Sequence, residues 1–187
     1  DVTMLGTLPE RELRAGMAEV VKSAIVGDVE LFDYMEQRAG GDIYTSRETL
    51  QEIVLRAVVV KSAIVEEDER ESGRRRVLNL GHTIGHAIER TSHQFNHGEA
   101  VAIGMAMIGR AAVRLGVMQC AEAERIERLL SALGFNLELP VPLVKVVKAT
   151  RHDKKKRDNI LRVVLPERIG SVVVRELPYD EFERLFI

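Results

Sequence analysis

Residues 79–90, Asn79-Leu-Gly-His-Thr-Ile-Gly-His-Ala-Ile-Glu-Arg90, predict a helix that carries two histidines on one face. Side chains four residues apart project from the same side of an α-helix, so the imidazoles of His82 and His86 should lie together. His97-Gly98-Glu99 begins the next predicted helix, which runs from about residue 98 to 115 and is rich in Ala, Gly and Met. A helix hairpin would return His97 to the face of His82, and the small residues favour close packing against neighbours.

The flanking segments extend this helical pattern over most of the chain. Apolar residues recur at helical spacing from Glu10 onward, at about 47–69, at 121–133 and at about 179–185. The pattern changes near the C-terminus, where residues 160–165 and 171–175 predict a β-hairpin around Pro166-Glu-Arg-Ile-Gly170. The predicted fold class is therefore mainly α: one multi-helix domain over residues 1–187 with a small β-hairpin near the C-terminus.

The composition describes an ordinary globular domain and excludes several functional classes. Hydrophobic residues make up 45% and charged residues 30%, and the net charge of −2 gives no overall field that favours nucleic acid or a membrane surface. No apolar run approaches the roughly 20 residues of a membrane span, and residues 1–9 do not resemble a secretory signal. Cys120 is the only cysteine, which excludes an internal disulfide. We expect a cytoplasmic protein with Cys120, Met105 and Met107 in its core.

A metal site is the main chemical possibility that the histidines raise. Four of the five histidines fall between residues 82 and 97. Neutral imidazoles are common zinc ligands, and a catalytic zinc takes three protein ligands and keeps a fourth position open. Glu19 lies in an apolar helical segment, where a carboxylate requires a partner or a metal, but Lys22 and Lys61 are equally plausible partners. The spacing alone predicts no more than a metallohydrolase or a metal-dependent dehydrogenase.

Several phrases of this sequence, in matching order and spacing, resemble the C-terminal half of the 3-dehydroquinate synthases, a family of sugar phosphate cyclases. These phrases are Leu8-Pro-Glu-Arg-Glu-Leu-Arg-Ala-Gly-Met-Ala-Glu-Val-Val-Lys22, Lys61, Glu66-Glu-Asp-Glu-Arg-Glu71, Leu78-Asn-Leu-Gly-His-Thr-Ile-Gly-His-Ala87, His97-Gly-Glu-Ala-Val-Ala-Ile-Gly-Met105 and Asp153-Lys-Lys155. The resemblance runs from residue 1 to about residue 185, so it covers essentially the whole chain.

The resemblance implies a role for particular residues. It assigns a zinc (or cobalt) ion to Glu19, His82 and His97, and it leaves His86 outside the ligand set. The implied catalytic residues are Glu71, His86, Lys22, Arg75 and Asn79. The implied substrate-binding residues are Lys61, Lys22, Arg75, Asn79, His86, His97, Lys154 and Lys155, and the choice among Lys154, Lys155 and Lys156 stays open.

The resemblance also implies an activity and its partners. The family converts 3-deoxy-arabino-heptulosonate 7-phosphate to 3-dehydroquinate and phosphate in the shikimate pathway. The steps are transient oxidation by NAD, phosphate elimination, re-reduction and an intramolecular aldol closure. The full enzyme is expected to be a homodimer with an N-terminal NAD-binding domain, and no Gly-rich turn after a strand represents that domain here. We expect this chain alone to bind zinc, to bind neither NAD nor the anionic sugar phosphate tightly, and to lack synthase activity.

Three alternatives remain open from the sequence. One is another sugar phosphate cyclase of the 2-deoxy-scyllo-inosose or valiolone type, although Asn79 and His86 favour the dehydroquinate enzyme. A second is a metal-dependent alcohol or glycerol dehydrogenase, whose first metal ligand is usually Asp, whereas this chain has Glu19. The third is a non-catalytic helical interaction domain, which would bind no metal.

Overall fold

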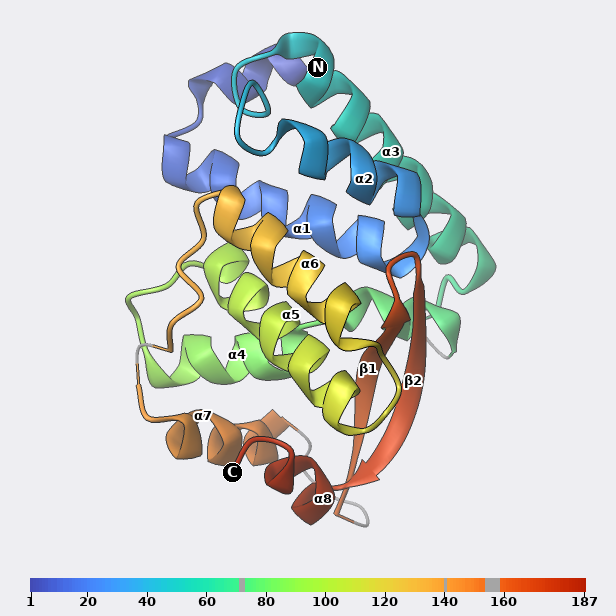
Figure 1. Ribbon diagram of the computed structural model, residues 1–187, viewed down its shortest axis with the longest axis vertical. Coiled ribbons are helices and arrows are strands. Elements are labelled where there is room, and N and C mark those ends of the chain that lie inside the picture. The colour runs from blue at the N-terminus through green and yellow to red at the C-terminus, as the bar shows by residue number, and fades with distance from the viewer. Residues whose placement is uncertain (71–72, 140, 154–158) are drawn as a thin grey trace.

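A computed structural model describes residues 1–70, 73–139, 141–153 and 159–187 (Figure 1). Its α-helices are α1 (Glu10–Gly27), α2 (Val29–Arg38), α3 (Arg47–Glu67), α4 (His82–Thr91), α5 (His97–Arg114), α6 (Cys120–Ala132), α7 (Leu143–Ala149) and α8 (Tyr179–Arg184). Short 3-10 helices are η1 (Val2–Thr7), η2 (Arg74–Asn79) and η3 (Thr150–Asp153), and the strands are β1 (Ile160–Arg168) and β2 (Ser171–Pro178). The predicted mainly α fold with a C-terminal hairpin is confirmed.

Helix α5 is the centre of the packing, and it contacts α1, α4, α6 and β1. Figure 1 shows α1, α2 and α3 gathered at one end of the molecule, with α4, α5 and α6 beside them and the hairpin along one side. Most of α5 is buried, including Met105 and Met107, as its Ala-, Gly- and Met-rich sequence predicts. Neither α5 nor any other helix in the described ranges has the length and apolar character needed to cross a membrane.

The hairpin packs against α1 and α5. Strands β1 and β2 are antiparallel, and their pairing runs from Ile160 opposite Pro178 to Pro166 opposite Val172 before a register irregularity. The backbone N–H of Gly170 in the turn donates to the carbonyl of Ile25 at 2.9 Å, which attaches the turn to the C-terminal part of α1.

Asp28 connects α1, α2 and α3. Its carboxylate caps α2 by accepting from the N–H of Leu31 at 2.8 Å. It also accepts two hydrogen bonds from the Arg56 guanidinium on α3, at 2.9 and 2.6 Å. Burial raises the pKa of Asp28, but the hydrogen bonds from Arg56 and Leu31 and the charge of Arg56 outweigh it, so the net shift is downward.

The predicted helix over residues 79–90 is divided in the structure. Asn79 ends η2, and α4 begins only at His82. Gly81 between them has φ 78°, a left-handed conformation, and a Cβ there would lie 2.9 Å from the backbone N of Met105. Glycine therefore permits both the turn and the close approach to α5.

Other differences involve short elements and helix ends. The sequence pattern did not predict η1 or α7, since elements of six and seven residues contain too little periodicity to stand out. Helix η2 begins in the polar, Gly-containing segment between α3 and α4, where the sequence shows no helical periodicity. The prediction that Cys120 lies in the core was wrong. Cys120 is exposed at the first residue of α6, and its thiol donates to Glu124 at 3.4 Å.

Candidate metal and substrate site

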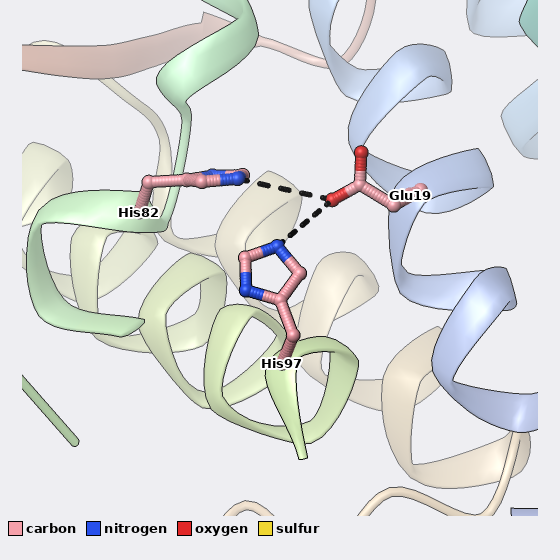
Figure 2. A group of neighbouring side chains, drawn as sticks. All are labelled: Glu19, His82 and His97. Carbon is pink, nitrogen blue, oxygen red and sulfur yellow. Dashed lines mark ion pairs between the residues drawn. The ribbon is translucent and has the colours of Figure 1, made fainter. Parts of the chain in front are cut away.

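Three helices bring Glu19, His82 and His97 together (Figure 2). Glu19 lies in the middle of α1, while the two histidines are the first residues of α4 and α5. Glu19 Oε1 lies 3.9 Å from Nε2 of His82 and 3.9 Å from Nε2 of His97, and all three candidate ligand atoms lie within 4.8 Å of one another. Tetrahedral zinc with bonds of about 2.0–2.2 Å places its ligand atoms roughly 3.3–3.6 Å apart, so small movements would close this set around one ion.

One oxygen of Glu19 accepts no hydrogen bond from the described residues, which supports the fit to a cation. Oε1 is buried, and within the described residues it has no hydrogen-bond partner. A buried carboxylate oxygen without a hydrogen bond costs free energy, because it has lost its water and the nearest histidine nitrogens, at 3.9 Å, are too far away to replace it. One carboxylate and two imidazoles are a donor set that suits zinc or cobalt. The residues present therefore fit a divalent transition metal.

Lys22 holds the other oxygen of Glu19. The Lys22 side chain is only 7% exposed, and its Nζ lies 2.6 Å from Glu19 Oε2. Burial raises the pKa of Glu19, but the charge and hydrogen bond of Lys22, with smaller contributions from His82 and His97, bring it below its usual value. The sequence left Lys22 and a metal as competing partners of Glu19. In the structure Oε2 of Glu19 contacts Lys22, while Oε1 faces the position where a metal would bind.

The electrostatic surroundings also favour a neutral His82. Burial lowers the pKa of His82, and the positive charge of Lys22 lowers it further. The Nδ1 atom of His82 lies 3.1 Å from the carbonyl oxygen of Leu80. A hydrogen bond from Nδ1–H to that carbonyl leaves the Nε2 lone pair directed at the metal position, as metal-binding imidazoles require.

The position of His97 follows from the two residues after it. A Cβ on Gly98 would lie 2.3 Å from the backbone oxygen of Ala15, so only glycine lets the start of α5 contact α1 this closely. Glu99 forms a capping box with Asn96. It also accepts two hydrogen bonds from Arg11 of α1, at 2.9 and 2.6 Å. Gly98 and Glu99 therefore fix His97 beside Glu19 without themselves being ligands.

His86 lies next to the proposed ligands. Its ring centroid is 5.3 Å from that of His82 and 6.1 Å from that of His97. His86, Glu89 and His97 form a second group whose candidate ligand atoms are close together. The sequence pattern did not lead us to predict a role for Glu89. Positions 82, 86 and 89 nevertheless share one face of a helix, so the spacing could have indicated it.

The remaining predicted residues lie at the edge of this site or outside the described residues. Lys61 is exposed on α3. Burial is the main cause that lowers the pKa of Lys22, and the positive charge of Lys61 lowers it further. Asn79 is exposed at the end of η2. Arg75 is half-buried, and its guanidinium donates to the carbonyl of Glu69 at 2.8 Å, which turns it toward the adjoining segment. Glu71, Lys154 and Lys155 lie outside the described residues.

Comparison with known proteins identifies the family. Residues 16–156 match the family model described as 3-dehydroquinate synthase C-terminal. The chain belongs to this family. The 3-dehydroquinate synthase of Geobacter sp. (strain M21) is 43% identical over 180 residues, which are 95% of this chain and 50% of that protein. The enzyme of Nostoc punctiforme is 43% identical over 187 residues, 96% of this chain and 52% of its own length. The chain thus spans about half the length of these relatives.

Solved structures of other sugar phosphate cyclases have the same fold. One is the 2-epi-5-epi-valiolone synthase of Streptomyces hygroscopicus subsp. jinggangensis 5008 with NAD+ and Zn2+ bound. It is 29% identical, has a TM-score of 0.87, and is matched over 99% of this chain and 53% of that one. The other is a 2-deoxy-scyllo-inosose synthase complexed with carbaglucose-6-phosphate, NAD+ and Co2+, with a TM-score of 0.82, 23% identity and coverage of 96% and 53%. The predicted family and fold are confirmed.

Proposed function

We propose that this chain is the metal-binding half of a 3-dehydroquinate synthase. The complete enzyme would convert 3-deoxy-arabino-heptulosonate 7-phosphate to 3-dehydroquinate and phosphate by transient oxidation, elimination, re-reduction and aldol closure. The observation that carries the proposal is the meeting of Glu19 with His82 and His97 in a chain of this family, with a buried carboxylate oxygen that has no hydrogen bond within the described residues.

Glu19, His82 and His97 would hold the metal, and zinc or cobalt suits this donor set. A bound divalent ion would act as a Lewis acid toward substrate hydroxyls. Lys22 orients the Glu19 carboxylate through the 2.6 Å contact and favours its ionised form. The neutral state of His82 keeps its Nε2 lone pair available.

The substrate would contact Lys22, Lys61, Asn79 and His86. The two lysines supply positive charge for the phosphate or carboxylate of the sugar acid, and their charges already influence one another. His86 lies beside the ligand histidines, and it would exchange a proton with a group bound there. Roles for Glu71, Arg75, Lys154 and Lys155 rest on the family resemblance.

The redox cofactor would come from the part of the enzyme that this chain does not represent. The chain spans about half of its curated relatives, and we propose that an NAD-binding domain accounts for the other half. We further propose that the complete enzyme is a homodimer in the cytoplasm.

The valiolone-type cyclase is the second candidate, because such an enzyme is matched over 99% of this chain with a TM-score of 0.87. Its identity of 29% is lower than the 43% of the 3-dehydroquinate synthases, which favours the dehydroquinate reaction. A dehydrogenase receives less support, since the similar structures described above are cyclases. A non-catalytic interaction domain gives no reason for a buried oxygen of Glu19 without a hydrogen bond.

A chimera tests the proposal. The chain would be fused to the N-terminal half of the Geobacter enzyme, and phosphate release would be measured with NAD, zinc and the heptulosonate phosphate. We expect turnover by the chimera and none by the 187-residue chain alone. Turnover only with a substrate of 2-epi-5-epi-valiolone synthase would reassign the reaction, and turnover by the isolated chain would contradict the need for a second domain.

A further inference from the structure

Glu89 contacts His97 on the side of the ring that faces away from Glu19. Its Oε1 lies 3.2 Å from Nδ1 of His97, while Nε2 of the same ring points to Glu19 Oε1 at 3.9 Å. Glu89 comes from α4 and His97 from the start of α5, so the contact joins the two helices that carry the histidines. His97 lies between two carboxylates, one at the metal position and one behind it.

A neutral imidazole has one N–H donor and one lone-pair acceptor. A carboxylate can only accept, so contact with Glu89 places the proton on Nδ1 and the lone pair on Nε2. In His82 the acceptor that lies beside Nδ1 is the backbone carbonyl of Leu80. That carbonyl belongs to the backbone, whereas the acceptor behind His97 is a side chain that a substitution can remove.

We propose that Glu89 is a positioning residue that fixes the tautomer and ring orientation of His97 for metal binding. The inference rests on the metal site of the proposed function. His97 has more need of such support than His82, because its side chain is 49% exposed and that of His82 is 13% exposed. Acceptors behind metal-bound histidines change metal affinity by about 10- to 100-fold. Partial exposure of Glu89, at 32%, places the expected effect near the lower end.

The same residues allow a second arrangement, in which His86, Glu89 and His97 bind an ion of their own. His97 would then have to use Nδ1 as a ligand and could not donate a proton from it. The 3.2 Å separation of Nδ1 and Oε1 is a hydrogen-bond distance, which favours positioning. A second ion is therefore an outcome that the test must be able to detect.

The test compares Glu89→Ala and Glu89→Gln with a matched control, Glu127→Gln. Glu127 is 27% exposed and accepts two hydrogen bonds from Arg110, at 2.6 and 2.7 Å. Arg110 lies thirteen residues after His97 on α5, about 20 Å along the helix. The probes are Zn2+ alone, with affinity and stoichiometry measured by competition with a chelator, and Co2+ alone, whose visible absorption reports ligand geometry. Circular dichroism of each variant measures folding.

We expect one ion per chain, a loss of Zn2+ affinity of about tenfold in Glu89→Ala and an altered Co2+ spectrum. Glu89→Gln keeps an acceptor oxygen and should lose less, about threefold, with Glu127→Gln unchanged. Wild-type affinity and spectrum in a folded Glu89→Ala or Glu89→Gln variant would overturn the proposal. So would two ions in the wild type and one in the variant, which would make Glu89 a ligand. No metal binding by the wild type would instead remove the proposed function, and this inference with it.

Discussion

The helices that bring Glu19, His82 and His97 together differ in how their side chains are held from the C-terminal part of α3 and the segment that follows it. The ligand-bearing helices touch through their backbones, and the space for a Cβ at Gly98 is already filled by Ala15. The Lys61 side chain, by contrast, is exposed, and the guanidinium of Arg75 donates to the carbonyl of Glu69. We therefore expect metal binding to be a property of this fold, while substrate binding depends on exposed groups that the substrate must order.

Among the variants that test this comparison, Gly98→Ala should have the largest effect. The added methyl would lie 2.3 Å from the backbone oxygen of Ala15, so α5 must move away from α1 and carry His97 with it. We expect a loss of roughly 3 kcal/mol in the free energy of unfolding, at the upper end of overpacking effects, together with loss of metal binding. Urea unfolding and Zn2+ titration measure the two effects.

Gly109→Ala is the matched control on the same helix. Its Cβ would meet Ala123 Cβ at 3.8 Å, an ordinary contact, and alanine favours helix by up to about 1 kcal/mol over glycine. We expect unchanged or slightly higher stability and normal metal affinity. Equal losses in the two variants would contradict the idea that the α1–α5 contact positions the metal site.

Glu19→Gln should have the next largest effect. We expect this effect on metal affinity and not on the stability of the fold. The amide keeps the shape of the side chain but removes the charge that both Lys22 and a cation require. We expect Zn2+ affinity to fall by more than the roughly 100-fold upper limit for residues behind the ligands. Glu12→Gln on the same helix is the control, and its affinity should not change. Stoichiometric zinc retained by Glu19→Gln would remove Glu19 from the ligand set.

The same contrast explains what the sequence could predict. The spacing of His82 and His86, and the small residues of α5, predicted a close-packed histidine hairpin, and the structure contains one. The break at Gly81 was not foreseen, because a helical pattern does not reveal a left-handed residue that contacts another helix. The contacts of Glu99 with Arg11 and of Glu89 with His97 link residues that the local pattern treats separately.

The resemblance contributed what spacing could not. It selected Glu19, His82 and His97 as ligands and excluded His86. The structure brings these three together, and their binding of an ion stays a prediction. The roles of Glu71, Lys154 and Lys155 also stay predictions. Arg75 and Asn79 belong to a segment whose conformation local periodicity does not determine, so the sequence could name them but could not orient them.

Asp28→Asn should produce a moderate loss of stability far from the ligands. It weakens the cap of α2 and the ion pair with Arg56, and we expect a loss of about 1–2 kcal/mol at pH 7. Because folding lowers the pKa of Asp28, its contribution is complete above the unfolded value of about 3.9 and is lost as pH falls through the folded value. The free energies of unfolding of the two proteins should therefore converge as the pH falls below the unfolded pKa of about 3.9 and through the lower pKa of the folded state. A difference that stays constant with pH would show that charge is not the cause.

Lys61→Ala should have the smallest effect on the fold. The side chain is exposed, and substitutions at such positions change stability by no more than about 0.5 kcal/mol. Lys145→Ala, at an exposed position of α7, is the control. Both variants should bind Zn2+ as the wild type does. In the chimera, however, only Lys61→Ala should lower kcat/KM for the sugar phosphate, by about tenfold or more, because an ammonium group that contacts an anion contributes about 1.5–3 kcal/mol. Equal activity of the two variants would mean that Lys61 is only a surface charge, and it would restrict the substrate side of the site to residues nearer the histidines.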